Sequence, residues 1–533
     1  MARKRSSGRI VVAVSIQILS YGLAAGAQVT TAQYGNSRTG ATLAETILSP
    51  SKVNSQDLGK LFSIAVDGDV YAQPLYVPHL EISGMGKHNV LFVATEHDSV
   101  YAFDADAPSS APLWKASFLD PASGITTVPP MDVSCPFIQP EIGISSTPVI
   151  DLESATIYVL ARTKEHKHYV QRLHALDIGT GKEKFGGPVT IQASTERVQK
   201  NASPVRIDFD PLRENQRAAL LLDKGKVYVA WASSCDVDPY HGWVIAYEAR
   251  TLRQAGSFNT SPDGEQGGIW QGDAGAAADG RGSVFVVTGN GTFDAAEGGR
   301  DYGNSILKLA SQDQGLIVRD SFTPFNQEKL NADDLDLGSS GPVLLPNLSR
   351  AHPHLLVVAG KGEGIYVVDR DRMGRYRPDS NRHAVQFIPG ISDCFGAPAY
   401  WNLNIYYACE NDSLKAFSVK DGLISPEPIA RSAIKFSGVG ATPTISANGA
   451  KNGIVWVIAT PNFFAKNAPA ILYAYDASNV AHELYNSEQN SSRDRAGIAL
   501  RFSMPTVAKG RVYIGTKNEV DVYGLISANS NTR

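Results

Sequence analysis

A short strand-and-turn phrase recurs along the whole chain, and this repeat constrains the fold more than any other feature. The phrase occupies residues 99–104, 172–177, 244–248, 364–369, 413–417, 471–476 and 519–523, and its first copy reads Ser-Val-Tyr-Ala-Phe-Asp. Each copy alternates as a half-buried strand does, and an acidic residue often begins the turn that follows. Several short strands in every repeat are typical of radial repetition, so the sequence predicts a β-propeller.

Two further strands can be placed in each repeat. Runs of β-branched and aromatic residues precede the phrase at 90–93, 157–160, 227–231, 284–287, 355–358, 405–408, 454–457 and 512–515. A segment of small residues precedes each run and begins the blade, with proline at Pro74, Pro148, Pro342, Pro398, Pro443 and Pro505, and without it at 218–219 and 275–276. Pro74 and Pro505 are 431 residues apart, which is seven intervals of about 62. The sequence therefore predicts an all-β fold of eight four-stranded antiparallel blades.

The last blade is predicted to be completed by the start of the chain. Only three strands of the eighth blade precede Ile526, whereas the strand-like run from Lys60 to Val66 has no neighbour in sequence. Pairing of this run with Glu519–Leu525 closes the ring and removes two exposed sheet edges. We therefore expect a signal peptide at 1–27, an N-terminal extension at 28–57, the propeller at 58–526 and a tail at 527–533.

The first residues resemble an export signal. Arg3, Lys4 and Arg5 precede a mostly apolar stretch at 10–23, and small residues at 25–27 offer a cleavage site before Gln28. Nothing after that point has the length and hydrophobicity of a membrane span. The mature protein is therefore expected in the periplasm or outside the cell. The formal net charge is −4 with mixed signs and no basic stripe, which argues against a nucleic-acid partner.

Four cysteines allow three pairings. Cys394 and Cys409 flank neighbouring strands of the predicted sixth blade, so we expect them to be bonded. Cys135 and Cys235 lie in loops of blades two and three, and we expect a second disulfide between them. An exported chain favours structural disulfides, with a metal or redox site as the alternative. The sequence contains no Cys-x-x-Cys-His motif, so no covalently attached haem is expected.

The phrase is clearest at 175–182, which reads Ala-Leu-Asp-Ile-Gly-Thr-Gly-Lys, and it resembles the repeat of propellers related to pyrroloquinoline quinone (PQQ) dehydrogenases. The resemblance covers residues 58–526. Many propellers with this repeat are assembly scaffolds without a cofactor, so the repeat alone implies only a fold.

Three segments extend the resemblance to quinoprotein alcohol dehydrogenases. Residues 267–270 (Gly-Gly-Ile-Trp), followed by 284–291, resemble the region in which a tryptophan packs beneath the quinone and an asparagine binds the metal. The resemblance implies that Trp270 packs beneath the quinone and that Asn290 binds the metal. The loop at 322–336 resembles the family loop that supplies the catalytic aspartate, which implies that Asp334 or Asp336 is the catalytic aspartate. Lys361 resembles the basic residue that contacts the quinone carbonyls. By this resemblance, an aspartate accepts the alcohol proton and Lys361 stabilises charge on the quinone oxygen.

The sequence departs from the family at two places. The family's neighbouring cysteines, whose disulfide ring covers the quinone, correspond here to Ser134-Cys135, so this cover is expected to be missing. The family's metal-binding glutamate corresponds to a segment with Asp236 and Asp238, either of which offers an oxygen ligand. The resemblance as a whole implies PQQ held with calcium or a lanthanide, an alcohol or sugar substrate, and a separate soluble electron carrier.

Each of these residues also has an ordinary structural interpretation. Trp270 can cap a blade interface, Asn290 can occupy a turn, the acids at 333–336 can form a solvated loop and Lys361 can be a turn lysine. Two functional classes therefore stay open: a quinoprotein dehydrogenase, and a non-catalytic propeller that binds a protein or glycan partner. A dehydrogenase requires these side chains to converge on the ring axis, whereas a binding scaffold leaves them dispersed.

Overall fold

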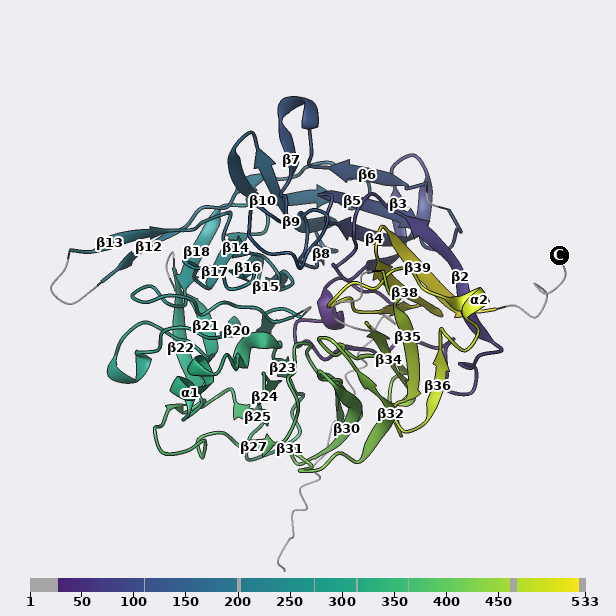
Figure 1. The fold of residues 1–533 in the computed structure, drawn as a ribbon. Helices are drawn as coiled ribbons and strands as arrows, with labels where there is room; N and C mark the ends of the chain where they lie inside the picture. The colour runs from purple at the N-terminus through teal and green to yellow at the C-terminus, as the bar shows by residue number, and fades with distance from the viewer. Residues whose placement is uncertain are drawn as a thin grey trace, which may run out of the picture.

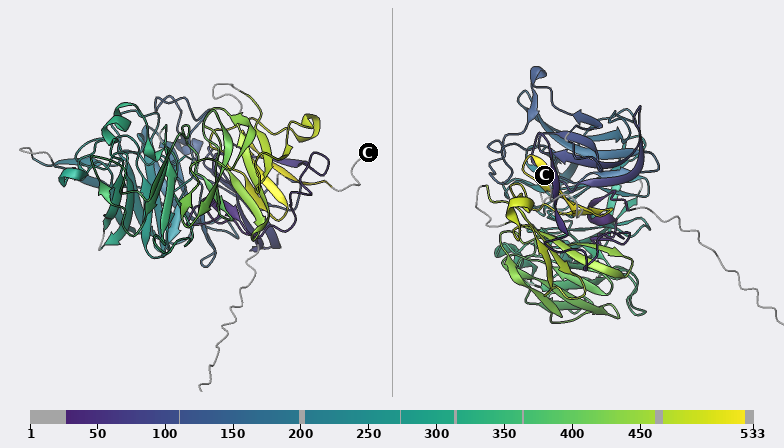
Figure 2. Two further views of the ribbon diagram at one scale, coloured as in Figure 1. Left: turned by 90° about the horizontal axis from the view of Figure 1, so that it is seen from below. Right: turned by 90° about the vertical axis from the view of Figure 1, so that its right-hand side faces the viewer.

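The computed structural model describes residues 27–109, 111–198, 203–272, 274–312, 315–362, 364–460 and 467–526. Eight small antiparallel sheets surround one axis in sequence order, which confirms the predicted eight-bladed propeller (Figure 1). Seen from the side, the ring is a flattened disc (Figure 2). The signal peptide predicted at 1–27 falls almost entirely outside the described residues, as does the tail at 527–533.

The first four blades occupy residues 75–323. Blade 1 contains β3 (Leu75–Ile82), β4 (Gly86–Thr95), β5 (Ser99–Asp104) and β6 (Trp114–Ser117). Blade 2 contains β8 (Val149–Asp151), β9 (Thr156–Glu165), β10 (His168–Asp177) and β11 (Val189–Thr190). Blade 3 contains β15 (Leu221–Asp223), β16 (Lys226–Ser233), β17 (Trp243–Glu248) and β18 (Gln254–Asn259). Blade 4 contains β19 (Ala277–Ala278), β20 (Ser283–Val287), β21 (Ile306–Gln312) and β22 (Gly315–Thr323).

The other four blades complete the ring. Blade 5 contains β23 (Val343–Leu344), β24 (Leu355–Ala359), β25 (Gly364–Asp369) and β27 (Gln386–Pro389). Blade 6 contains β28 (Ala399–Trp401), β29 (Asn404–Tyr407) and β30 (Asp412–Lys420), with β31 (Leu423–Ile424) and β32 (Ala430–Phe436) both paired to β30. Blade 7 contains β33 (Thr444–Asn448), β34 (Lys451–Ala459), β35 (Ile471–Asp476) and β36 (Glu483–Asn486). Blade 8 contains β37 (Thr506–Ala508), β38 (Arg511–Thr516), β39 (Glu519–Leu525) and β2 (Leu58–Ala65).

Short additional elements decorate this ring. β7 (Ile125–Thr127), β14 (Glu214–Asn215) and β26 (Arg375–Tyr376) extend blades 2, 3 and 4, and β12 (Ser194–Arg197) pairs only with β13 (Val205–Asp208) as a projecting hairpin. The helical pieces are η1 (Ala32–Tyr34), η2 (Pro121–Ser123), η3 (Ala295–Glu297), α1 (Gln327–Ala332), η4 (Leu337–Ser339) and α2 (Ser491–Asp494). Among the described residues, no helix is long and apolar enough to cross a bilayer.

The ring closes as the sequence predicts. β2 pairs antiparallel with β39, from Leu58 opposite Leu525 to Ala65 opposite Glu519. Each blade buries apolar side chains against its neighbours, as Phe285 and Val287 of blade 4 do with Leu356 and Val358 of blade 5. The hydrophobic core is therefore divided among the blade interfaces, which leaves the two ends of the axis to other residues.

One end of the axis is filled by residues 29–45, which we call the axial plug (Figure 1, purple near the centre). The plug bonds to the innermost strand of every blade. Its contacts in blade order are Val29 with Tyr76, Thr30 with Ile150, Asn36 with Leu222 and Ala278, Ser37 with Leu344, Thr39 with Tyr400, β1 (Ala41–Thr42) with β33, and Tyr34 with Val507. Residues 29–45 of the extension predicted at 28–57 therefore bond to the ring.

Arg38 fixes the centre of the plug. Its guanidinium is fully buried and donates hydrogen bonds to the carbonyl oxygens of Ala32, Leu220 and Ala276 and to the Thr31 hydroxyl, at 2.8 to 3.1 Å. Burial lowers the pKa of Arg38 to about 9. The charge is accommodated entirely by backbone and hydroxyl oxygens from the plug and from blades 3 and 4.

Candidate functional site

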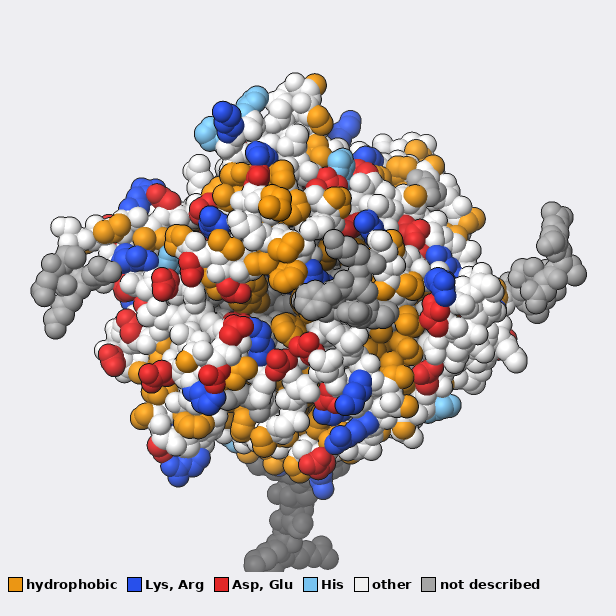
Figure 3. Space-filling model, viewed as in Figure 1, with side chains coloured by type: hydrophobic (Ala, Val, Ile, Leu, Met, Phe, Trp, Pro, Cys, Tyr) orange, Lys and Arg blue, Asp and Glu red, His pale blue; other side chains and the backbone are white. Residues whose placement is uncertain are grey.

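A cavity of about 220 Å³ lies at the opposite end of the axis. The segment that leads into the innermost strand of each blade contributes to its wall, through Tyr71, Thr147, Arg217, Gly272, Ser339, Phe395, Val439 and Phe502 for blades 1 to 8. Hydrophobic side chains gather around the centre of this face, with acidic and basic side chains between them (Figure 3). The propeller therefore has a plugged end and an open end.

Trp270 lies in the wall of this cavity, on the loop that leads from blade 3 to blade 4. The ring of Tyr240 packs edge-on against it, with centroids 6.2 Å apart. Its buried Nε1–H has no hydrogen-bond partner among the described residues. The Nε1 edge of the indole lies against the backbone of Gly268 and Gly289, so the aromatic surface of Trp270, and not its N–H, is what a planar ligand can contact.

A disulfide between Cys135 and Cys235 also lines the cavity, with a Cα–Cα distance of 5.5 Å. It joins loops of blades 2 and 3, as the sequence predicts. It is not a ring of neighbouring cysteines, so the expectation that the family's disulfide cover is missing stays a prediction. Two cysteines 100 residues apart place a disulfide in the cavity wall.

Asp336 and Lys361 form an ion pair in the cavity wall. Lys361 Nζ lies 2.6 Å from Asp336 Oδ2, and the side chains are only 16% and 7% exposed, respectively. Asp336 Oδ1 accepts a hydrogen bond of 2.8 Å from the Asn290 backbone N–H. Burial raises the pKa of Asp336 even though Lys361 opposes the rise. The negative charges of Asp336 and Asp334 raise the pKa of Lys361 against the effect of its own burial.

A single glycine permits this arrangement. A Cβ atom on Gly289 would lie 2.2 Å from Asp336 Oδ1 and 2.9 Å from Trp270 Cδ1. Trp270 and Asp336 therefore approach the same stretch of backbone, directly after β20. Any side chain at position 289 would displace one of them.

Asn290 and Asp334 contact residues of the cavity wall or their neighbours but do not line the cavity. Asn290 Nδ2 donates to Asp334 Oδ1 at 2.7 Å, and Asn290 Oδ1 accepts from Asn304 Nδ2 at 2.9 Å. The Asp334 side chain is 75% exposed and lies 3.2 Å from Lys361 Nζ. Both residues are therefore linked to the Asp336–Lys361 pair without themselves lining the cavity.

The structure separates the two aspartates of the third blade. Asp236 lines the cavity and accepts a hydrogen bond of 2.8 Å from the Tyr240 hydroxyl. Its pKa is raised by burial and by the charges of Asp336 and Asp334. Asp238 instead accepts hydrogen bonds of 3.3 Å from Gln266 Nε2 and does not line the cavity.

The oxygen donors do not form an assembled cation site in this arrangement. Within the described residues, no three carboxylate, imidazole or thiol groups are grouped closely enough to hold a metal. Lys361 contacts Asp336, and Asn304 contacts the side-chain oxygen of Asn290. The aromatic and cationic groups of the wall are in place without any change, whereas a cation requires these contacts to rearrange.

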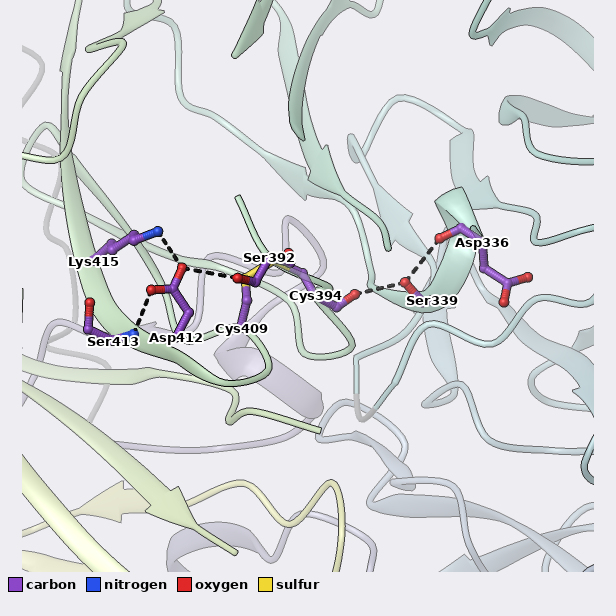
Figure 4. The surroundings of a disulfide bond; sticks show 8 residues. All are labelled: Asp336, Ser339, Ser392, Cys394, Cys409, Asp412, Ser413 and Lys415. Carbon is purple, nitrogen blue, oxygen red and sulfur yellow. Dashed lines mark hydrogen bonds and ion pairs between the residues drawn. A yellow bond between two sulfur atoms is a disulfide. The ribbon is translucent and has the colours of Figure 1, made fainter. Parts of the chain in front are cut away.

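The second disulfide supports Asp336 from outside the cavity. Cys394 and Cys409 are bonded, with a Cα–Cα distance of 4.5 Å, as the sequence predicts. The Ser339 hydroxyl contacts the Cys394 carbonyl oxygen at 2.7 Å and the Asp336 carbonyl oxygen at 3.1 Å (Figure 4). The disulfide of blade 6 is thereby connected to the loop that positions the Asp336 carboxylate.

Sequence reasoning missed part of the wall, namely Phe137, Arg217, Phe395, Arg501 and Phe502. Three of them lie one to three residues before the small-residue segment that begins a blade: Arg217 before 218–219, Phe395 before Pro398 and Phe502 before Pro505. Because these segments surround the axis, residues at such positions could have been identified as wall residues from the repeat alone.

No protein-family model matches the sequence, and no curated protein does. Among solved structures, quinohemoprotein alcohol dehydrogenase ADHIIG from Pseudomonas putida HK5 matches with a TM-score of 0.57 and 14% identity, over 94% of this chain and 80% of that one. Quinohemoprotein alcohol dehydrogenase from Comamonas testosteroni matches with a TM-score of 0.57 and 14% identity, over 95% and 81%. The chain therefore has the eight-bladed fold of the PQQ-like propellers.

Proposed function

We propose that this protein is an exported quinoprotein dehydrogenase that binds PQQ in the axial cavity, oxidises an alcohol or sugar, and passes electrons to a separate soluble carrier. The observation that carries the proposal is the convergence of Trp270, the Cys135–Cys235 disulfide and the Asp336–Lys361 pair on one cavity. These groups come from four different blades or the loops between them. A scaffold without a ligand has no need to gather them at the axis.

PQQ would supply the two-electron redox chemistry that protein side chains lack. Trp270 offers a stacking surface, and Lys361 offers a cation to oxygens that gain negative charge. The protein thus provides orientation and electrostatic stabilisation.

Asp336 is better placed than Asp334 to accept the substrate proton. Asp336 lines the cavity and its pKa is raised by burial, so it is a stronger base than an ordinary aspartate. The Asp334 side chain is largely in solvent and serves to hold Asn290 and Lys361. We therefore assign proton acceptance to Asp336 and a positioning role to Asp334.

The resemblance also implies calcium or a lanthanide. Asp236, Asp336 and Asn290 are the oxygen donors nearest to such a role, but Lys361 and Asn304 contact two of them. A cation bound here would have to displace these two contacts. Whether PQQ binding requires a cation is tested in a separate arm of the experiment.

The test is to titrate PQQ into the purified protein with calcium, with lanthanum, or with a chelator. Tryptophan fluorescence and quinone absorbance report binding, and reduction of a dye with a panel of alcohols and sugars reports turnover. Saturable binding with substrate-dependent dye reduction is expected. Absence of PQQ binding in all three arms would overturn the proposal.

Asp336→Asn provides the sharper test. This change should lower kcat by about 100-fold or more while PQQ still binds, because it removes the base without removing the wall. Asp333→Asn is the matched control, since Asp333 lies three residues away, is 47% exposed and pairs with Lys329. Equal activity of both variants would exclude Asp336 as the base.

The second candidate is a non-catalytic propeller that binds a protein or glycan. The observation in its favour is the loop beside the cavity, where Met131 is 82% exposed and Phe137 is 43% exposed. If this candidate is right, the protein should bind glycans or a defined protein with no response to PQQ. Met131→Ser should then weaken that binding.

A further inference from the structure

The hairpin of β12 and β13 projects from the rim of the ring, and the two edges of this small sheet differ (Figure 1). The edge of β12 is bonded to loops of the propeller. The Val198 N–H donates to the Asp263 carboxylate at 2.6 Å, and Arg300 Nη2 donates to the Glu196 carbonyl oxygen at 2.7 Å. Arg300 and Asp263 also form an ion pair with each other. The edge of β12 is therefore closed to another strand.

The edge of β13 is open. The Phe209 N–H donates to the Ala193 carbonyl oxygen at 2.9 Å, so the odd-numbered residues of the hairpin bond across it. The backbone N–H and C=O groups of Arg206 and Asp208 therefore point away from β12. Among the described residues, no strand other than β12 pairs with β13, and the side chains of Arg206 and Asp208 are 71% and 61% exposed. An edge of this kind can accept another strand.

The residues of β13 fit an antiparallel copy of the same strand in one register. A two-fold axis beside Ile207 places Arg206 of each copy opposite Asp208 of the other, with their backbone groups facing one another. An axis beside Arg206 or beside Asp208 would instead place like charges opposite each other. An axis beside Val205 would place Arg206 opposite Pro204, which has no backbone N–H. Charge and proline therefore select the register centred on Ile207.

Both faces of the resulting four-stranded sheet are compatible with this register. Glu196 lies opposite Arg206 within the hairpin. A row across the paired hairpins therefore runs from Glu196 through Arg206 to Asp208 of the second copy, with alternating charges. On the other face, the two Ile207 side chains meet beside Val205, which is 56% exposed in a single chain. A two-stranded sheet is marginally stable in water, so two added strands stabilise it.

We propose that two copies of this protein associate through the free edges of their β13 strands, in the register centred on Ile207. The partner that fits this edge is thus a second copy of the chain, related by a two-fold axis. The interface is small, so the dimer forms weakly and reversibly. It is independent of the proposed function, because the hairpin contributes no residue to the cavity wall.

The first experiment measures the mass of the purified protein by sedimentation velocity and light scattering, from about 1 to about 200 µM. The average mass should rise with concentration towards that of a dimer. The dissociation constant should increase as salt rises from about 50 to about 500 mM, because exposed charge pairs contribute to the interface. A monomer at every concentration would overturn the proposal. So would binding of a different protein at this edge by a chain that stays monomeric.

Charge variants test the register. Arg206→Glu and Asp208→Lys should each raise the dissociation constant at least about 10-fold, because like charges then face each other. An equimolar mixture of these two variants should associate as tightly as wild type, since each altered side chain faces an opposite charge on the other chain. The double variant Arg206→Asp, Asp208→Arg should also associate, which an axis beside residue 206 or 208 would not allow.

Arg382→Glu is the matched control, since Arg382 is 79% exposed and pairs with Asp379 in another blade. This variant should associate as wild type does. Restored association in the mixture also shows that the single variants keep a folded hairpin. Dimers that persist unchanged in both single variants, or a mixture that stays monomeric, would overturn the proposed interface.

Discussion

The two ends of the propeller axis accommodate buried charge in different ways. At the plugged end, Arg38 donates only to backbone carbonyls and a hydroxyl, and the plug bonds to all eight blades. At the open end, Lys361 pairs with Asp336, and Asp236 lies in the same wall with a raised pKa. The first arrangement is complete without a ligand. The second keeps charged groups around an open cavity.

The two disulfides also distinguish the open end from the plugged end. All four cysteines lie at the open end, where one disulfide lines the cavity and the other supports the Asp336 loop. The plugged end relies on hydrogen bonds from a single continuous segment. Loops that surround a cavity cannot be fixed by packing their side chains into it. The disulfides fix these loops instead, as side-chain packing fixes the strands between the blades.

The largest effect is expected at the plugged end. Arg38→Ala should lower the free energy of unfolding by about 4 kcal/mol or more, because several buried carbonyl groups lose their donor together. Urea unfolding measures this change. Arg250→Ala, at an exposed ion pair, should change stability by less than about 0.5 kcal/mol. A stable Arg38→Ala protein would show that the plug is not required to hold the ring.

Loss of the cavity disulfide should have the next largest effect. The Cys135→Ser, Cys235→Ser double variant should lose about 2 to 4 kcal/mol, because the bond closes a loop of 100 residues. The corresponding Cys394, Cys409 variant should lose less, since that loop spans 15 residues. Urea unfolding of both variants under oxidising conditions compares them. The opposite order would show that the Asp336 support matters more than loop length.

The buried acid Glu96 should make the free energy of unfolding depend on pH. Glu96 is fully buried, accepts a 2.7 Å hydrogen bond from the Gly143 N–H, and has its pKa raised by burial to about 7. An acid with a raised pKa contributes stability below its unfolded pKa of about 4.5, and this contribution is lost as pH rises towards 7. The wild-type protein should therefore lose about 3 kcal/mol across this window through Glu96.

Glu96→Gln should remove this part of the pH dependence. The variant should be more stable than wild type above pH 7 and differ little at pH 4, since the amide oxygen can still accept from Gly143. Thermal unfolding from pH 4 to 8 checks the prediction. Parallel stability curves for the two proteins would show that Glu96 does not titrate in this range.

Several features of the molecule could be predicted from local sequence. The eight blades and the Cys394–Cys409 disulfide follow from repeats and spacing, because strands of one blade are close in sequence. The closing strand and the Cys135–Cys235 disulfide join distant parts of the chain, and they were predicted from the strand count and from the positions of the loops in the repeat. Asp336, Lys361 and Trp270 were identified by resemblance, and the structure brings them to one cavity. Their chemical roles stay predictions.

Other features could not be predicted in this way. The repeat gives no information on residues 29–45, whose bonds reach blades up to several hundred residues away. The choice of Asp236 over Asp238 as a wall residue depends on how one loop turns at the axis. The contacts of Arg217 with Phe502 and of Arg501 with Phe137 could not be predicted, because they join different blades and form only once the ring has closed.

The sequence by itself determined the propeller, since alternating strands and turn residues act within a few residues of one another. Only the tertiary structure decided which end of the axis is filled and which is open. Both ends are built from segments of all eight blades, so the identity of each group depends on contacts that exist only after the ring has closed. Long-range closure, and not local propensity, placed Arg38 in a plug and Arg217 in a cavity wall.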